Sequence, residues 1–496
     1  MQVITDLHIH SKYSRAVSPK MEILEIARWA RKKGIDLVAT GDWTHPLWLR
    51  EIKANLEEDG SGLLRIKESS LEVESQERSN FSRTANSSPP KFLLSTEISS
   101  IYSQGGKGRR IHTLIFAPSI AVVEKINKEL TKKGLNLISD GRPIIGLSAK
   151  DLAKLVLGVN KQCLVVPAHI WTPWFSMFGS KSGFDSVEEC FGDMAKYIYG
   201  IETGLSSDPI MNWRIKDLDK RAILSFSDAH SGPKLGREAT VFELKEPTFN
   251  NLRGAIMARQ KWEVGSEKWD VEVGSGNDKS DNSKIEKIKN STSKTSHVSH
   301  LTSRILYTIE FHPEEGKYHY TGHRNCQVRQ SPAETKKLGT TCPSCGRPLT
   351  VGVMHRVQQL AGHEIKKEEL KITNDENGVK WTGYGNRPPY VSLVPLVEIL
   401  SETLGGAPTT LKIQTEYGNL ISKLGSEFDL LLKIPTQKIT EISGEKVAEA
   451  IKKVRAGDIV VEPGYDGVFG KVKIWGEKKE GGEKGEIQEK KQLSMF

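Results

Sequence analysis

The stretch Val3-Ile4-Thr5-Asp6-Leu7-His8-Ile9-His10 decides the fold of the first part of the chain. A short apolar run of the kind that forms strands is followed by an acidic residue and two histidines at alternate positions. One histidine at the end of a strand is more often a hydrogen-bonded residue of the core or its rim than a metal ligand. The question is therefore whether other strands of the chain end in the same way.

Over about the first 260 residues, short apolar runs of this kind alternate with stretches that have helical patterns. A helix is expected from Ser18-Pro19 to Gly34, because Leu24, Ala27 and Ala30 fall at helical spacing. Strands are expected over residues 35–40, 92–96, 111–116, 164–168, 198–202 and 222–226. This alternation predicts an α/β fold, either a β/α barrel or an open parallel sheet.

Nearly every expected strand ends in a residue of the kind that binds metal ions. These residues are His8, His10, Asp42, His45, Glu97, His112, His169, Asp228 and His230. In a parallel barrel, the strand ends converge on the face where such barrels hold their active sites. We therefore expect these side chains to meet in one catalytic metal site.

Several histidines and carboxylates in one cavity suit two or three divalent ions (Zn²⁺, Mn²⁺ or Mg²⁺), with a carboxylate bridging two of them. Such a cluster lowers the pKa of a bound water and neutralises the charge of a phosphoester. Phosphoester hydrolysis is therefore the expected reaction. Amide hydrolysis or deamination on a similar site is the alternative, which the net charge of +9 makes less favoured.

The order of these motifs resembles the polymerase and histidinol phosphatase (PHP) family, whose fold is a distorted seven-stranded β/α barrel that holds three metals. The resemblance implies a first metal bound by His8, His10, Glu97 and Asp228. It implies a second metal bound by Glu97, His112 and His169, and a third bound by Asp42 or His45 with His230. Many members supply a third-metal histidine soon after the first pair, where this chain has Ser14-Arg15-Ala16. The third site is therefore expected to be weaker or built differently.

A second group of candidate ligands follows later in the chain. His323 and Cys326, then Cys342 and Cys345, form two pairs with the spacing of a tetrahedral zinc site. His312, His319 and His355 are rival candidates for the fourth ligand. Four protein ligands leave no position for water, so this Zn²⁺ is expected to be structural.

Composition divides the 496 residues into parts. We expect a PHP catalytic barrel over residues 1–265 with a polar insertion at about 57–90, a polar linker over 266–303, a zinc-binding module over 304–360, a helical C-terminal domain over 361–475 and a flexible tail over 476–496. In the helical domain, Val447, Ala448, Ile451 and Val454 form an apolar stripe. Cys163 and Cys190 lie outside the module and are expected to pack as small apolar side chains.

No apolar run reaches the ~20 residues of a membrane span. The N-terminal residues lack the basic start and the apolar stretch of a signal peptide. We therefore expect a monomeric, cytoplasmic protein, associated with the nucleoid and without a membrane partner.

The barrel, the zinc module and a C-terminal region that contains residues 462–471 (EPGYDGVFGK) together resemble the endonuclease Q family. The resemblance implies a DNA repair endonuclease whose partner is damaged DNA. Such an enzyme hydrolyses the phosphodiester 5′ to deaminated bases (uracil, hypoxanthine and xanthine) and to abasic sites.

A damaged base is read after it has been turned out of the stack, and an aromatic or apolar residue then fills or flanks the gap. The segment after His169 is aromatic, and its candidates for stacking are Trp171, Trp174 and Phe175. Packing of these rings within their own loop is the alternative. Candidates for contacts with DNA phosphates or bases are Arg109, Arg110, Lys181 and Trp213.

The last five residues, Gln492-Leu493-Ser494-Met495-Phe496, resemble the short peptide that binds the DNA sliding clamp. The resemblance implies that Gln492 anchors the peptide and that Leu493, Met495 and Phe496 enter an apolar pocket. A flexible charged linker in front of the peptide suits capture by such a partner.

Two other functions compete with the endonuclease. A PHP phosphatase acting on a small monoester such as histidinol phosphate needs only the barrel. A DNA-binding adaptor without catalysis is disfavoured because the ligand set is nearly complete.

Overall fold

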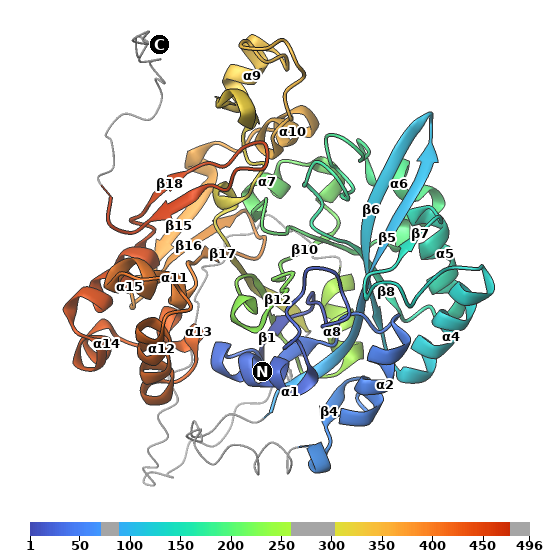
Figure 1. Ribbon diagram of the computed structural model, residues 1–496, viewed down its shortest axis with the longest axis horizontal. Helices are drawn as coiled ribbons and strands as arrows, with labels where there is room; N and C mark the ends of the chain where they lie inside the picture. Colours follow the sequence, from blue (N-terminus) through green and yellow to red (C-terminus); the bar gives the residue numbers. More distant parts are fainter. Residues whose placement is uncertain (71–88, 259–302, 477–496) are drawn as a thin grey trace, which may run out of the picture.

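The computed structural model describes residues 1–70, 89–258 and 303–476. Figure 1 shows a central sheet with helices around it, a small unit that contains α9 (Pro332–Leu338) and α10 (Val353–Leu360), and a group of helices on one side. The expected peptide at residues 492–496 lies outside the described residues, as does the expected linker apart from its last residue.

The first elements form the expected strand, helix and strand. β1 (Gln2–Asp6) pairs in parallel with β2 (Leu37–Ala39), and α1 (Ile23–Lys33) connects them. Gly34 ends α1 in the left-handed region, with φ of 85°. The predicted start at Ser18 is wrong, because α1 begins at Ile23 after an extended Glu22, while the N–H of Ser18 donates to the carbonyl of His230.

The sheet is mixed rather than parallel throughout. β2 pairs in parallel with β5 (Lys91–Gln104), but β6 (Lys107–Ala117) lies antiparallel to β5 and to β8 (Leu164–Pro167). β11 (Ala239–Glu243) is antiparallel to β1, while β9 (Gly200–Glu202) and β10 (Ala222–Leu224) form a separate parallel pair. The α/β class is therefore confirmed, whereas the all-parallel arrangement is wrong.

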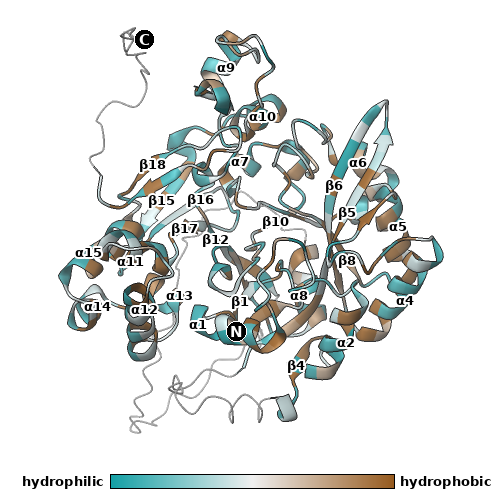
Figure 2. Cartoon of the chain, in the orientation of Figure 1, coloured by the Kyte–Doolittle hydropathy of each residue, from teal (hydrophilic) through white to brown (hydrophobic). Residues whose placement is uncertain are grey.

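Strands β5 and β6 extend well beyond their apolar runs. They form a long hairpin that turns at Gly105 and Gly106, whose φ angles of 61° and 73° few other residues adopt. In Figure 2 the outer half of this hairpin is mainly teal and pale, since its residues are polar or charged. Glu97 and His112 consequently lie within strands, so the prediction that they mark strand ends is wrong.

Three short strands extend the sheet: β3 (Leu56–Glu58) and β4 (Leu64–Ile66) at one edge, and β7 (Ile144–Ile145) beside β5. The helices of this part are α2 (Pro46–Asn55), α4 (Ile120–Lys132), α5 (Ala149–Val159), α6 (Val187–Phe191), α7 (Pro209–Trp213) and α8 (Phe249–Met257). In α4, the buried side chains Val122, Val123, Ile126 and Leu130 form one face of the helix. Short 3₁₀ helices occur at Gly192–Tyr197, Lys216–Leu218, Gly232–Lys234, Pro313–Glu315, Arg324–Cys326 and Lys367–Glu369.

The chain returns to the same sheet after residue 302. β12 (Arg304–Glu310) pairs with β11, and β17 (Tyr390–Ser392), β16 (Lys380–Tyr384) and β15 (Leu370–Asn374) continue the sheet. The region expected to be helical therefore begins with three strands, which its composition did not predict.

The C-terminal helices confirm the predicted helical part. They are α11 (Leu396–Leu404), α12 (Leu411–Leu424), α13 (Glu427–Leu432), α14 (Thr436–Ser443) and α15 (Glu445–Ala456). The stripe Val447, Ala448, Ile451 and Val454 is buried, as expected. The small unit contains β13 (Thr321–His323) and β14 (Val328–Gln330), and the hairpin of β18 (Val460–Glu462) and β19 (Lys471–Lys473) follows the helices.

A buried ion pair joins the helical part to α1. Lys33 Nζ lies 2.7 Å from Glu427 Oε2, with side-chain exposures of 2% and 4%. Tyr417 Oη donates to the same carboxylate at 2.8 Å, and the N–H of Leu396 donates to it at 3.0 Å. Three side-chain or main-chain donors of the protein therefore surround this buried carboxylate in place of water.

The structure also bears on the expected packing of two cysteines and on membrane-spanning helices. Cys163 and Cys190 are buried free thiols, as predicted. Among the described residues, no helix combines the length and the apolar character that a membrane crossing requires. The domain boundaries expected from composition stay predictions.

We expect Lys33→Met to lower the free energy of unfolding by about 3–5 kcal/mol, because it leaves the Glu427 carboxylate buried without its cation. Denaturation in urea, followed by circular dichroism, measures the change. Lys53→Met is the matched control, since Lys53 pairs with Glu124 on the surface with exposures of 49% and 50%. That control should change stability by less than about 1 kcal/mol. Equal effects of the two variants would contradict the role assigned to the buried pair.

Candidate active site

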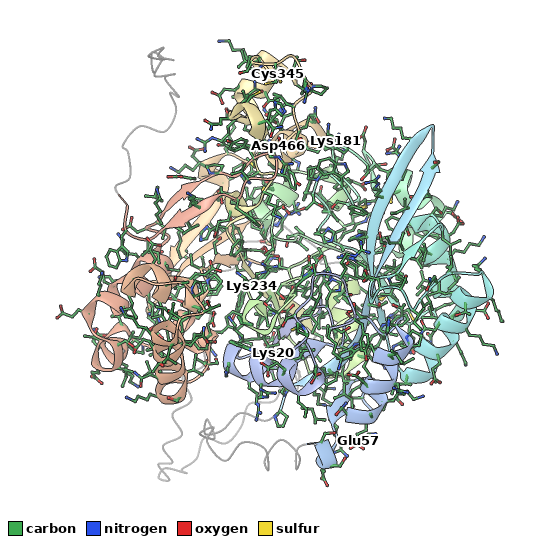
Figure 3. All side chains as sticks on the ribbon, viewed as in Figure 1. Lys20, Glu57, Lys181, Lys234, Cys345 and Asp466 are labelled. Atoms are coloured by element: carbon green, nitrogen blue, oxygen red, sulfur yellow. The ribbon has the colours of Figure 1, made fainter. Side chains whose placement is uncertain are left out.

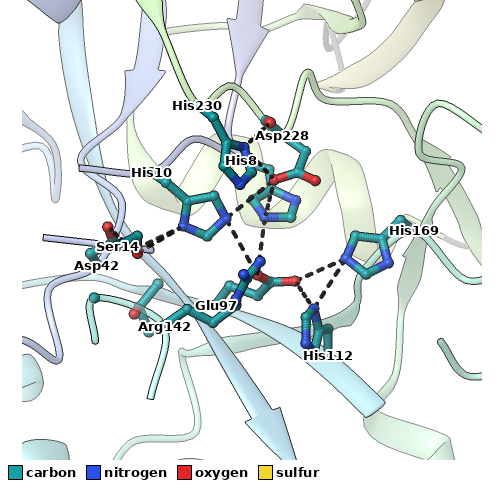
Figure 4. A network of polar contacts seen from close by, with 12 residues as sticks. His8, His10, Ser14, Asp42, Glu97, His112, Arg142, His169, Asp228 and His230 are labelled. Atoms are coloured by element: carbon teal, nitrogen blue, oxygen red, sulfur yellow. Dashed lines mark hydrogen bonds and ion pairs between the residues drawn. The ribbon is translucent and has the colours of Figure 1, made fainter. Parts of the chain in front are cut away.

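Seven of the nine predicted ligands converge around the carboxylate of Glu97, in three overlapping groups (Figure 4). The groups are His8, His10 and Glu97; Glu97, His112 and His169; and His10, Asp228 and His230. Within each group, one ligand atom per residue lies within 4.8 Å of the others. The structure therefore brings these seven side chains together, and their role as metal ligands stays a prediction.

The first group points its ring nitrogens at two carboxylates. His10 Nε2 lies 3.3 Å from Glu97 Oε2 and 3.2 Å from Asp228 Oδ1, while His8 Nε2 lies 3.8 and 3.6 Å from the same oxygens. The two Nε2 atoms and Asp228 Oδ1 are buried and have no hydrogen-bond partner among the described residues. Buried polar atoms are rarely left unpaired, so these atoms fit a bound cation.

The second group gathers at the other oxygen of Glu97. Glu97 Oε1 lies 2.7 Å from His112 Nδ1 and 3.0 Å from His169 Nε2, and the two ring nitrogens are 3.3 Å apart. Because Oε1 faces one group and Oε2 the other, Glu97 stands where a bridging carboxylate would stand between two divalent ions.

Two further carboxylates orient the histidines of the first group. His10 Nδ1 donates to Asp42 at 3.0 Å, and His8 Nδ1 donates to Glu202 at 2.8 Å. Metal-binding histidines commonly donate their other N–H to a carboxylate, which fixes the tautomer and leaves the opposite lone pair free. Glu202 was missed by the sequence reasoning, although its position at the end of β9 is the same signal that selected the other ligands.

Three site residues have a strained main chain. The φ angles of Asp42, His169 and Asp228 are 46°, 29° and 47°, in the region that favours glycine. Gly204 leaves room for His169, since a Cβ at residue 204 would lie 2.3 Å from His169 Cβ. The N–H of His169 donates to Glu202 Oε2 at 2.7 Å, and this bond helps to hold the strained segment.

Without a metal ion, the buried histidines and carboxylates of the site share their charges: burial opposes protonation of His8 and His10, yet the facing carboxylates raise the pKa of both well above the ordinary value. Burial opposes ionisation of Glu97, yet facing His112 and Arg142 hold its pKa well below the ordinary value. Burial likewise opposes ionisation of Asp228, whose pKa is lowered by His8 and His10. Burial lowers the pKa of His112 to about 4, so its imidazole is neutral at pH 7. The carboxylates are thus charged while His112 keeps a free lone pair.

The remaining predicted residues fall into different surroundings. His45 bonds to the carbonyl of Ile138 through Nε2 and stacks on Tyr13, and neither it nor Asp42 belongs to the three groups. Trp171 and Trp213 are each 1% exposed and pack in the core. Trp174 packs edge-on against Tyr318. These positions favour a packing role for both Trp171 and Trp213.

Phe175 is the aromatic candidate that reaches the site. Its ring lies 4.8 Å from the ring of His112, and its carbonyl accepts the N–H of His112. The guanidinium of Arg110 lies 5.5 Å from the same ring, while Arg109 stacks on Phe184 and donates to the carbonyl of Gly183. Lys181 is exposed, close to the small unit in the view of Figure 3.

Arg142 is a site residue that the sequence reasoning did not select. Its Nη1 donates to Glu97 Oε2 at 3.0 Å, and its side chain is 23% exposed. It precedes β7 in a loop without a strand end, so no pattern of the barrel indicated it.

The expected cysteine site is also assembled. His323, Cys326, Cys342 and Cys345 bring their ligand atoms within 4.8 Å of one another, and the rival histidines do not belong to this group. Burial raises the pKa of Cys342, but backbone N–H groups of Ser344 and Cys345 outweigh it and lower the pKa to about 6. Cys345 lies near the outer end of the small unit in Figure 3. The set is that of a tetrahedral metal site without an open position.

Sequence comparison finds relatives over part of the chain and over nearly all of it. The uncharacterized protein YqxK of Bacillus subtilis is 24% identical over 95% of this chain and 99% of that protein. Residues 395–458, which include α11 to α15, match the family model of the MJ0043 C-terminal domain. The chain is 30% identical to the uncharacterized protein MJ0043 of Methanocaldococcus jannaschii over 309 residues. This aligned segment covers 61% of this chain and 31% of that protein. The chain thus spans about a third of the length of this curated relative.

Two solved structures resemble nearly the whole chain. The lesion-specific endonuclease PfuEndoQ from Pyrococcus furiosus is 28% identical, with a TM-score of 0.71 over 97% of this chain and 98% of that chain. Endonuclease Q in complex with a 27-mer duplex substrate has the same identity and TM-score, over 97% of this chain and 99% of that chain. The predicted resemblance to endonuclease Q is confirmed. The likeness to endonuclease Q includes the small unit and the C-terminal helices as well as the sheet.

We expect Glu202→Gln to weaken the binding of divalent ions by about 10- to 100-fold, because the amide no longer holds His8 as a carboxylate does. Competition with a chromophoric chelator measures the affinity. Glu129→Gln on the exposed face of α4 is the control and should leave the affinity unchanged. An unchanged affinity in Glu202→Gln would contradict its orienting role.

The cysteine site should release its metal in acid. The lowered pKa of Cys342 favours the thiolate at neutral pH, and metal binding requires the thiolate. The affinity of the site for the metal is therefore expected to fall as the pH drops below about 6, because protons then compete with the metal for the thiolate. A colorimetric zinc indicator measures this affinity by competition. Equal affinities at pH 7 and pH 4 would contradict this expectation.

Proposed function

We propose that this protein is a metal-dependent DNA repair endonuclease that hydrolyses the phosphodiester 5′ to deaminated bases and abasic sites. The observation that carries the proposal is the arrangement of Glu97 between two groups of histidines, in a chain that resembles endonuclease Q over 97% of its length. The related structure holds a duplex with an abasic lesion at its active site.

The residues of the site would have two roles in such a reaction, metal binding and orientation of the ligands. His8, His10, Glu97 and Asp228 would hold one divalent ion, and Glu97, His112 and His169 would hold a second. Bound ions of this kind supply a hydroxide near neutral pH and stabilise the charge of the transition state. Asp42 and Glu202 fix the direction of the imidazoles, so the ligand atoms are already in place before the ions bind.

The DNA-facing residues are proposed from their position beside His112. Phe175 contacts the ring of His112 and has a partly exposed side chain, so it is the best candidate to stack on an extruded base or sugar. Arg110 and Lys181 are exposed on neighbouring segments and suit contacts with the DNA backbone. Zn²⁺ is proposed for the four-ligand cysteine site, because its ligand set is the one that tetrahedral zinc prefers.

A phosphatase for small monoesters is less favoured. Such an enzyme needs the metal site but not the small unit and the C-terminal helices, which are also included in the likeness to endonuclease Q. The sliding clamp is proposed as a partner from residues 492–496 alone. Binding of a purified clamp to the full chain, compared with a chain that ends at Lys491, tests this proposal.

We expect the protein with Mn²⁺ or Mg²⁺ to nick a duplex that carries one deoxyuridine, deoxyinosine or abasic site on the 5′ side of the lesion. Asp228→Ala should abolish this activity, since the residue belongs to the metal-binding cluster, and should leave the circular dichroism spectrum unchanged. Denaturing electrophoresis of the labelled strand measures the nick. An undamaged duplex is the control substrate. Rapid turnover of histidinol phosphate with no nick in any duplex would sink the proposal.

A further inference from the structure

The third metal site implied by the PHP resemblance does not fit the residues present. The group His10, Asp228 and His230 shares His10 with the first group. His10 Nδ1 donates to Asp42, so Nε2 is its only lone pair for a metal ion. An imidazole nitrogen has one lone pair and binds one ion. Once the first ion is bound, Asp228 and His230 are the ligands that this group has left.

Neither of the other implied ligands completes the third site. His45 bonds through Nε2 to the carbonyl of Ile138 and belongs to none of the three groups, and Asp42 is engaged elsewhere. Its carboxylate accepts hydrogen bonds from the N–H of Ser11 at 2.6 Å, from Ser11 Oγ at 2.7 Å and from Ser14 Oγ at 2.9 Å, in addition to the bond from His10. The side chain is fully buried. A carboxylate with these donors has the surroundings of an orienting residue rather than those of a metal ligand.

The main chain of a neighbouring loop fills the space beside Asp42. The N–H of Gly141 donates to the carbonyl of Tyr13, and a Cβ at Gly141 would lie 2.4 Å from Ser14 Oγ and 2.5 Å from Asp42 Oδ2. The next residue in this loop is Arg142. The loop that closes the place next to Asp42 therefore also brings a guanidinium to Glu97.

The charges of the site balance without a third ion. Glu97, Asp228, Asp42 and Glu202 carry four negative charges, which two divalent ions neutralise. Arg142, which also faces Asp140, adds a positive charge beside Glu97 that suits a negatively charged phosphodiester. Its side chain is 23% exposed, and within the described ranges its hydrogen bond to another side chain runs from Nη1 to Glu97, so the other N–H groups of the fork can reach a phosphate oxygen.

We infer that the catalytic cluster binds two divalent ions and that the guanidinium of Arg142 takes the place of a third cation, where it binds a non-bridging oxygen of the scissile phosphate. The part that concerns the phosphate rests on the proposed function. The number of ions does not.

The number of ions is tested by elemental analysis of the full-length protein after saturation with Zn²⁺ and removal of free metal. The wild-type chain should hold three ions, two in the cluster and one on the cysteine site. His112→Ala should lose about one ion, and His230→Ala should lose none. Four ions in the wild type, with three in His230→Ala, would overturn the two-ion cluster.

The role of Arg142 is tested by kinetics and by phosphate binding. On the lesion duplex, Arg142→Gln should lower kcat by about 100-fold or more with unchanged metal content, because a donor to the reacting group is lost. Inorganic phosphate should bind the metal-loaded Arg142→Gln variant at least about 10-fold more weakly than the wild type. Guanidinium ions should partly restore the activity of Arg142→Ala, which a merely structural role would not allow.

A matched control separates these effects from a general loss of positive charge. Arg65→Gln removes an exposed arginine that pairs with Glu57 on the β3–β4 hairpin, and it should match the wild type. Wild-type kcat and phosphate affinity in Arg142→Gln would overturn the assignment. If the wild-type protein cuts no lesion duplex, the proposed function fails, while the ion count and the phosphate titration still decide the two parts of this inference.

Discussion

The buried carboxylate of Glu97 is the constraint on which the rest of the site depends. A charged group in the interior is stable only when cations or hydrogen-bond donors surround it. Both of its oxygens are committed, one to His112 and His169, and the other to Arg142 beside the rings of His8 and His10. Glu97 can reach both groups because it lies in the middle of β5, where it pairs with Leu114 of β6, while β2 pairs with the start of β5 and β7 pairs with Ser99 and Ser100.

Several residues around Glu97 have strained main-chain angles that neighbouring hydrogen bonds stabilise. Asp42, His169 and Asp228 keep strained φ angles, which persist only where the surrounding structure supplies compensating contacts. Glu202 supplies two of them, since it accepts from both the ring of His8 and the main chain of His169. The same bonds that compensate for strain also aim the lone pairs, so the geometry of the site and its stability have a common origin.

The sequence allowed much of this site to be predicted, because β1, β2 and β8 are short apolar runs that stop just before polar ligands. It did not predict that Glu97 lies within a strand, since the outer half of the β5–β6 hairpin is polar and gives no apolar signal. Arg142 was not predictable from periodicity, because its position depends on how a loop packs on Asp42. The strands β15 to β17 were missed for a different reason, since β15 is mostly exposed and lacks the apolar run of a buried strand, although it pairs with the neighbouring β16.

The small unit that carries the cysteine site contacts the loop beside the metal cluster, although the two are far apart in the sequence. Arg356 of α10 donates to the carbonyls of Phe178 and Phe184 and pairs with Asp185, so it holds both ends of the loop that follows His169. The same loop carries Phe175, whose carbonyl accepts the N–H of His112. The position of a ligand of the second group therefore depends on how the unit containing α10 is folded. A metal ion bound at the cysteine site would therefore also stabilise the loop at the active site, to which the small unit is joined by Arg356, by the bond of Ser180 to Val351 and by the contact of Trp174 with Tyr318.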